Sequence, residues 1–369
     1  MIKETLADLV RIDSVSTRSN AEIVAYLERR CEALGLITRR FPYTDEHSVE
    51  KINLIALSHD VDEVELALVG HTDTVPYDPN WSEATNLTER DSKLYGRGAC
   101  DTKGFIAAAL TAVENVKTNK PLALVFTADE EVGLLGAKKL AQAKPLRVRY
   151  SIVGEPTSLK PIRAGKGYSL AEVIVKGREA HSAYPALGAS AVFRAARLIN
   201  RLESIAAQLK SDQHAAFDPP YTTVNIGLIH GGSAKNVLAG ECRFTLEWRP
   251  IPTQASEHVL NLLNAAIAEE VQADPDFQCE VNASRQDTGF ETATDSTLVQ
   301  LLEKATGNPS ATVAFGTEAA QMKVLGAEAV VIGPGDIREA HRTGEFVPVD
   351  ELERCAEILG QAIREICGA

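Results

Sequence analysis

The feature that most limits how this chain can fold is a series of short apolar segments that alternate with helical patterns. Residues 64–70 (VELALVG), 121–128 (PLALVFTA) and 150–154 (YSIVG) are nearly continuous apolar runs, typical of strands buried on both faces of a sheet. Between the first two runs, residues 104–116 (GFIAAALTAVENV) predict a helix with an apolar face. This order predicts a mainly parallel sheet covered by helices on both faces.

The pattern changes near residue 165, where apolar and polar residues begin to alternate. Strands are predicted over 169–177, 222–231, 241–250 and 278–284, with helices over about 188–209 and 256–272. This strand-helix-strand-strand-helix-strand order is ferredoxin-like. Beyond residue 287 the chain returns to a helix (297–305), a strand (328–332) and a closing helix (350–366). We therefore expect an α/β catalytic domain formed by residues 1–165 and 287–369, with an α+β ferredoxin-like domain of residues 166–286 inserted into it.

Composition narrows the class of protein. The length of 369 residues suits about two domains, and 44% hydrophobic with 24% charged residues is typical of a soluble folded protein. A net charge of −13 disfavours nucleic acid as a partner. No stretch approaches the roughly 20 apolar residues that span a bilayer, and the N-terminus lacks the apolar centre of a signal peptide. The six scattered cysteines fit a reducing compartment, so we expect a cytoplasmic protein without a membrane partner.

Acidic and histidine residues follow the predicted strands, at the edge of a parallel sheet where ligands bind. They are His71 and Asp73, Glu130 and Glu131, Glu155, His341, and Asp101 just before the 104–116 helix. Each alone also fits a structural role, so the prediction depends on their joint placement. Carboxylates gathered at one edge repel each other unless cations are present. Three carboxylates and a hydroxide balance two divalent ions, and the mixed nitrogen and oxygen donors suit two Zn²⁺, with Co²⁺ or Mn²⁺ as substitutes. Asp73 lies two positions after His71 and is expected to orient its imidazole.

These residues occur in motifs spread almost from end to end. The motifs are GHTDTVP (70–76), KLYGRGACDTKGF (93–105), TADEE (127–131), GEPTSLKPIRAGKG (154–167), GREAHS (177–182), NIGLIHGG (225–232), WRPIP (248–252), FGTEA (315–319) and GPGDIREAH (333–341). Through them the chain resembles the di-zinc aminoacylase and carboxypeptidase family. The resemblance implies His71 and Glu155 on one zinc, Glu131 and His341 on the other, Asp101 bridging both, and Glu130 as the general base.

The resemblance also implies roles for the inserted domain. His181 would bind the oxyanion in the site of a partner subunit, so a homodimer through this domain, which also acts as a lid, is expected. Lys166, Asn236 and Arg249 match positions that hold a substrate carboxylate, although each fits a structural role equally well. Gly316 and Thr317 suggest a pocket of backbone and hydroxyl groups, and Glu318 is expected to meet a cationic substrate side chain.

The activity implied is hydrolysis of the Nα-acyl amide of a small amino acid. The leading substrate is N-acetyl-L-ornithine, which would give L-ornithine and acetate for arginine biosynthesis. Succinyl-diaminopimelate desuccinylase, acetylcitrulline deacetylase and dipeptidase activities remain open, as does a non-catalytic binding protein on the same fold. The chain has no GxSxG motif of a serine hydrolase and no phosphate-binding loop of the GxxxxGK[ST] type.

Overall fold

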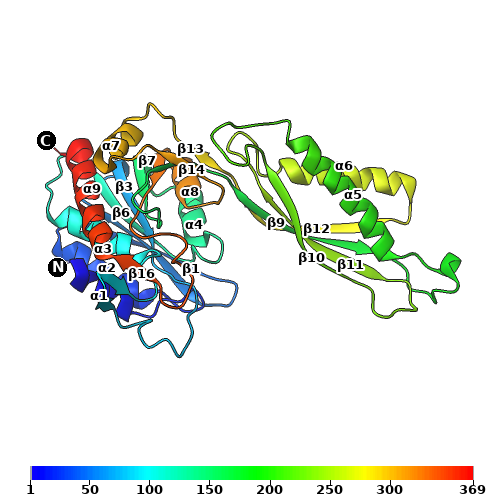
Figure 1. Ribbon diagram of the computed structural model, residues 1–369. Coiled ribbons are helices and arrows are strands. Elements are labelled where there is room, and N and C mark those ends of the chain that lie inside the picture. The colour runs from blue at the N-terminus through cyan, green and yellow to red at the C-terminus, as the bar shows by residue number, and fades with distance from the viewer. Residues whose placement is uncertain (1, 369) are drawn as a thin grey trace. The chain divides into compact units, whose positions relative to one another are not determined.

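The computed structural model describes residues 2–368, which form two compact units (Figure 1). Unit 1 contains the residues up to Arg163, the segment Glu291–Ala311 and the residues from Thr317 onward. Unit 2 contains Ala164–Phe290 and the short segment Thr312–Gly316. We had expected this last segment to lie wholly within the second part of the catalytic domain.

Unit 1 is built on a sheet with the strand order β1-β2-β6-β3-β7-β15-β8-β13, and β14 pairs with β8. The bounds are β1 Ile37–Thr44, β2 Glu50–Leu57, β3 Glu63–His71, β6 Leu122–Thr127, β7 Arg147–Val153, β8 Ile162–Gly165, β13 Phe290–Glu291, β14 Ala311–Val313 and β15 Glu328–Val331. The four central strands β6, β3, β7 and β15 are parallel, which confirms the predicted centre of the sheet. The flanks differ, because β1, β2 and β8 pair antiparallel.

Helices cover both faces of this sheet, as predicted (Figure 1). One face carries α1 Ile2–Arg11, α2 Ala21–Ala33, α3 Lys103–Glu114, α7 Thr297–Thr306 and α9 Val349–Cys367. The other carries α4 Leu135–Ala143 and α8 Ala319–Val324. Helix α3 is almost entirely buried because it packs against β3, α1 and α9, which explains why its sequence is apolar nearly all round. A small separate sheet joins β16 Phe346–Pro348, β5 Lys93–Tyr95 and β4 Thr88–Arg90.

Unit 2 has the predicted ferredoxin-like topology. Its elements are β9 Tyr168–Lys176, α5 Ala191–Leu209, β10 Thr223–Gly231, β11 Glu241–Arg249, α6 His258–Ala273 and β12 Gln278–Asp287, with a short 3₁₀ turn at Pro185–Leu187. The strands form an antiparallel sheet in the order β10-β11-β9-β12. Its core includes Val173, Leu198, Phe244 and Leu263, from both the strands and the helices. Alternate residues of β11 are buried, which is the period-2 pattern that its sequence predicts.

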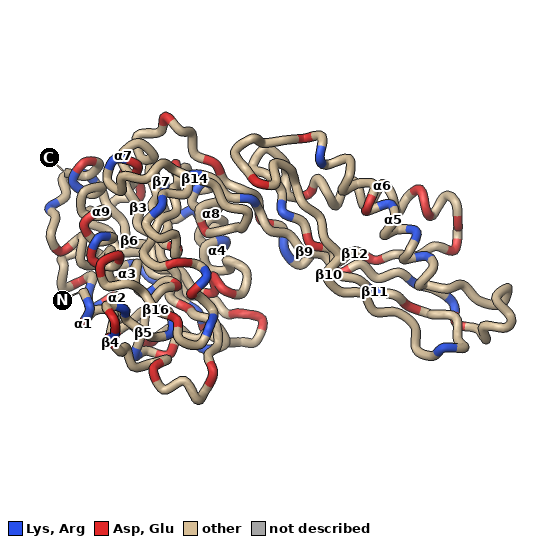
Figure 2. Tube along the Cα trace, in the orientation of Figure 1, with Lys and Arg blue, Asp and Glu red and all other residues tan. Residues whose placement is uncertain are grey.

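Charged residues are distributed along both units. Figure 2 shows acidic and basic positions interspersed along the trace of each unit. Within residues 2–368, no helix combines the length and the apolar character needed to cross a membrane.

Candidate metal centre

His71 is the last residue of β3, and its side chain is almost completely buried. Its Nδ1 lies 3.0 Å from the main-chain carbonyl oxygen of Asp73, whereas the Asp73 carboxylate is 3.8 Å away. A carbonyl oxygen only accepts hydrogen bonds, so Nδ1 carries the proton. In the neutral imidazole, Nε2 is then free to act as a ligand. The main chain of Asp73, rather than its carboxylate, makes the closer contact with this ring.

Asp101 lies between two imidazoles. It precedes α3, and its side chain is buried. Its Oδ1 is 3.0 Å from His71 Nε2, and its Oδ2 is 3.2 Å from His341 Nε2. Hydrogen bonds from these two rings hold the pKa of Asp101 well below its usual range, although burial opposes the shift. Each oxygen of one carboxylate therefore faces a different potential metal ligand.

Glu131 completes the second half of this arrangement. Its Oε1 and Oε2 lie 3.1 and 3.0 Å from His341 Nε2. Hydrogen bonds to Asp101 and Glu131 raise the pKa of His341 to about 10. The two carboxylates therefore favour positive charge beside His341 Nε2. Within the described chain, His71, Asp101 and Glu131 have ligand atoms that all lie within 4.8 Å of one another.

Asp73 positions the acidic loop that follows β6. Its Oδ1 accepts a hydrogen bond from the main-chain N–H of Glu130 (3.0 Å), and its Oδ2 accepts one from that of Glu131 (3.3 Å). The Ser16 hydroxyl donates to the same Oδ2 over 2.8 Å. Asp73 thereby fixes the main chain of both glutamates.

Glu155 is buried and Glu130 is half-buried, and the pKa of each carboxyl group lies above its usual value. Burial, together with the charges of Glu131, Glu318 and Asp101, raises the pKa of Glu130 well above its usual value. Burial and the charges of Asp101 and Glu130 do the same for Glu155, in the loop after β7. The charge of Asp101 contributes to both upward shifts in pKa.

A buried ion pair lies behind the acidic loop. Lys51 Nζ is 2.7 Å from Asp129 Oδ1, and both side chains are only 1% exposed. The lysine also donates to the carbonyl oxygens of Ser16 and Arg18. The Tyr43 hydroxyl donates to Asp129 Oδ2 over 2.8 Å. Asp129 has a positive φ of 55°, so these contacts hold a strained residue next to Glu130.

Two predicted site residues are neighbours at one end of unit 2. His181 forms a bridge with Val237, and the main-chain N–H of Ser182 donates to the carbonyl of Asn236 over 3.0 Å. Both His181 and Asn236 are exposed. His181 Nδ1 accepts a hydrogen bond from the main-chain N–H of Ala183 over 3.1 Å.

Lys166 and Arg249, two residues of unit 2 that are predicted to bind a substrate carboxylate, contact other groups of this unit in the structure. Lys166 is buried, and its ammonium donates to the carbonyls of Pro219 and Tyr221 over 2.7 Å each. These hydrogen bonds stabilise the loop, and the contact of Lys166 with a substrate carboxylate stays a prediction. The Arg249 guanidinium lies 4.5 Å from the centre of the Tyr168 ring and remains half-buried.

The FGTEA segment crosses the division between the units. Gly316 belongs to unit 2, beside Tyr168, while Thr317 and Glu318 belong to unit 1 and are buried. Burial raises the pKa of Glu318 to about 7. Among residues 2–368, its Oε1 has no hydrogen-bond partner. Its side chain is 1% exposed, and its contact with a cationic substrate side chain stays a prediction.

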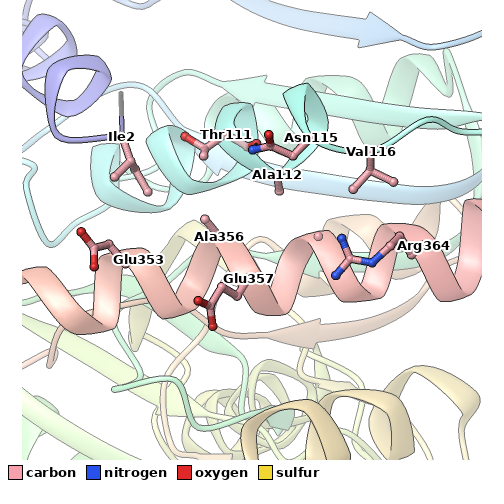
Figure 3. A pocket seen from close by; sticks show the side chains of 10 residues that line it. Ile2, Thr111, Ala112, Asn115, Val116, Glu353, Ala356, Glu357 and Arg364 are labelled. Atoms are coloured by element: carbon pink, nitrogen blue, oxygen red, sulfur yellow. The ribbon is translucent and has the colours of Figure 1, made fainter.

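A groove of about 310 Å³ lies elsewhere in unit 1, between α3 and α9. Figure 3 shows Thr111 of α3 and Asn115, the residue that follows this helix, on one side, and Glu353 and Arg364 of α9 on the other. None of the predicted ligands lines it.

The sequence analysis did not identify two buried charged residues close to the main chain of Asp101. Arg97 and Glu345 form an ion pair of 2.5 Å, with side chains 4% and 1% exposed. Arg97 lies inside the quoted motif KLYGRGACDTKGF, which was a usable signal. Glu345 follows His341 by four residues, in a segment where nothing in the local pattern indicates burial.

Comparison with known proteins decides the family. The model of peptidase family M20/M25/M40 matches residues 67–365. The chain belongs to this family. It is 53% identical over 371 residues to acetylornithine deacetylase of Myxococcus xanthus, an alignment that covers 100% of this chain and 98% of the relative. These findings confirm the predicted resemblance and the prediction of a metal-dependent amide hydrolase.

Solved structures agree on the fold. Aminopeptidase PepT from Bacillus cereus superposes with a TM-score of 0.78 at 22% identity and covers 99% of this chain and 98% of its own. The YXEP protein of Bacillus subtilis, described as a dinuclear metal-binding peptidase of the M20 family, superposes with a TM-score of 0.68 at 14% identity, covering 99% and 98%. Both matches extend through the two units, which confirms the predicted fold class.

Proposed function

We propose that this chain hydrolyses N-acetyl-L-ornithine to L-ornithine and acetate with the help of two divalent cations, zinc in the first place. The proposed ligands are His71, Asp101, Glu131, Glu155 and His341. Co²⁺ and Mn²⁺ are expected to substitute, because oxygen and imidazole donors accept both ions.

The observation that carries the proposal is the position of Asp101. Its two oxygens face the Nε2 atoms of His71 and His341 at 3.0 and 3.2 Å. If two cations are bound, His71 and His341 would help to hold them and Asp101 would be shared between them. A single ion, or a structural hydrogen bond, requires only one of the two contacts.

The donor set also fits the charge of two cations. Burial and neighbouring carboxylates raise the pKa values of Glu130 and Glu155 well above normal, so this cluster is costly to ionise without positive charge. Three carboxylate ligands and one hydroxide would balance the charge of two divalent ions, and the two imidazoles are neutral ligands. The dinuclear M20 relative of Bacillus subtilis supports the same stoichiometry.

Glu130 is the proposed general base and acid. When bound, the cations supply Lewis acidity that polarises the amide carbonyl and lowers the pKa of water. Glu130 takes a proton from the attacking water and returns it to the departing amine nitrogen. Asp73 holds the main chain of Glu130 in place for this transfer.

The substrate assignment follows from the relative in Myxococcus xanthus, whose similarity covers the whole chain. Arg249 remains a proposed partner for the substrate carboxylate, because its guanidinium is half-buried and stacked on Tyr168. Action of His181 in a partner subunit, a homodimer through unit 2, a lid motion of that unit and a cytoplasmic location remain predictions.

A substrate panel with one variant tests the proposal. Zinc- or cobalt-loaded protein is assayed on acetylornithine, acetylcitrulline, succinyl-diaminopimelate and a dipeptide, and we expect acetylornithine to give the highest kcat/KM. Glu130→Ala should lose nearly all turnover while two metals stay bound, measured by elemental analysis. Glu353→Ala, an exposed position on α9, is the control and should behave as wild type. Activity of Glu130→Ala near that of wild type would refute the role as base, and a preference for another panel member would refute the substrate.

A further inference from the structure

We propose that the buried Arg97–Glu345 ion pair is a positioning element that fixes Asp101 and joins the three loops that carry metal ligands. The inference rests on the ligands proposed above. Neither residue is itself a proposed ligand, and both are buried in unit 1.

Glu345 holds the main chain at Asp101 directly. Its Oε1 accepts hydrogen bonds from the main-chain N–H groups of Cys100 (2.9 Å) and Asp101 (3.1 Å). Its Oε2 faces Arg97 Nη1 at 2.5 Å. Hydrogen bonds to an ionised carboxylate are stronger than neutral ones, so one side chain controls where the Asp101 backbone lies. Glu345 also follows His341 in the same loop, so the two ligand-bearing segments are connected through this carboxylate.

Arg97 extends the connection to the loop after β3. Its Nη2 donates to the carbonyl of Pro76 over 3.3 Å, in the segment that begins with His71 and Asp73. The main-chain N–H of Gly96 donates to the carbonyl of Glu345 over 3.1 Å. The ion pair therefore connects residues 71–76, 96–101 and 341–345.

Close packing also holds the segment before His341 against the segment that contains Asp101. Gly335 has a φ of +84°, and a Cβ added there would lie 2.4 Å from Cys100 Sγ. The loop that leads to His341 is thus pressed against the residue that precedes Asp101.

Stability alone does not explain an ion pair at this depth. Desolvation offsets most of the attraction between two buried charges, and apolar residues of similar volume often serve as well. The ion pair instead orients the hydrogen-bonding groups around it. A planar guanidinium and a carboxylate fix several donors and acceptors at once, which an apolar pair cannot do. Mutation of groups that orient metal ligands typically weakens metal affinity about 10–100-fold.

The test measures metal binding to the full chain after removal of metal. Glu345→Gln keeps an oxygen acceptor but loses the charge, and Arg97→Lys keeps the charge but loses the planar fork. The matched control is Asp274→Asn in unit 2, where Arg194 binds Asp274 through two hydrogen bonds of 2.9 Å. Co²⁺ affinity and stoichiometry are measured by calorimetric titration, and the visible absorption of the dicobalt form reports ligand geometry. Circular dichroism of the metal-free proteins checks folding.

We expect both site variants to bind Co²⁺ about 10–100-fold more weakly with a changed spectrum, while Asp274→Asn stays within about twofold of wild type. Wild-type affinity and spectrum in Arg97→Lys and in any folded Glu345→Gln would overturn the inference, as would an equal loss in Asp274→Asn. If Glu345→Gln does not fold, Arg97→Lys decides alone. Fewer than two ions on the wild-type protein would instead refute the proposed metal centre, so the two failures are distinguishable.

Discussion

Replacement of Lys51 by methionine tests how far the acidic loop depends on the buried ion pair behind it. Lys51 and Asp129 are each 1% exposed and lie 2.7 Å apart, and the ammonium also holds the carbonyls of Ser16 and Arg18. Removing one member of a buried pair leaves the other charge unpaired, which costs about 3–5 kcal/mol. In a domain the size of unit 1, each kcal/mol lowers Tm by roughly 2–4 °C, so we expect a fall of about 6–20 °C.

The assay is urea and thermal unfolding of metal-free protein followed by circular dichroism. Lys139→Met is the control, because this exposed lysine lies 5.3 Å from the Tyr43 ring but makes no contact with Asp129. The double variant Lys51→Met/Asp129→Asn should recover part of the loss, since no unpaired charge remains. Asp129 precedes Glu130, so kcat should fall with little change in KM. A loss of less than about 1 kcal/mol, or one equal to that of the control, would show that the ion pair does not hold the loop.

Two further predictions concern stability. Burial raises the pKa of Glu318 to about 7, above its ordinary value near 4.5, so its contribution to stability is present at low pH and is lost as pH rises towards 7. Glu318→Gln should therefore remove a decline of up to about 3 kcal/mol between pH 4.5 and 7 in urea titrations of metal-free protein, and parallel curves for the two proteins would contradict this. Gly335→Ala should cost about 2 kcal/mol more than Gly344→Ala, because both have positive φ but only Gly335 faces Cys100 Sγ, at 2.4 Å from an added Cβ. Equal losses of stability in the two variants, measured by thermal unfolding, would show that the Cys100 side chain moves aside at little cost.

The strands at the centre of each unit could be predicted because the pattern of apolar residues along each strand reflects how it is buried. The apolar run of β3 and the alternation of β11 follow from burial on two faces and on one face. β1 and α8 were not predicted. The first is an edge strand without a fully buried residue, and the second is a helix of only six residues, so neither carries a clear apolar period.

The candidate ligands could also be predicted, since parallel strands bring their carboxyl ends to one edge and the motifs there are specific. The residues that support them could not. Lys51 and Glu345 are charged, and a charged residue in sequence is ordinarily expected at the surface. Their burial depends on partners at distant positions, Asp129 and Arg97, which only the folded chain supplies.

The sequence by itself determined the class of chemistry and the order of elements. Both can be read from the residue types in short motifs and from the local spacing of apolar residues along the chain. The tertiary structure decided the rest: that the two oxygens of Asp101 face different imidazoles, that Glu318 lies inside unit 1, and that the Lys166 ammonium is taken up by carbonyls. These facts concern direction and distance between residues far apart in sequence. Hydrogen bonds and charges act over a few ångströms, so only the folded arrangement fixes which of them form.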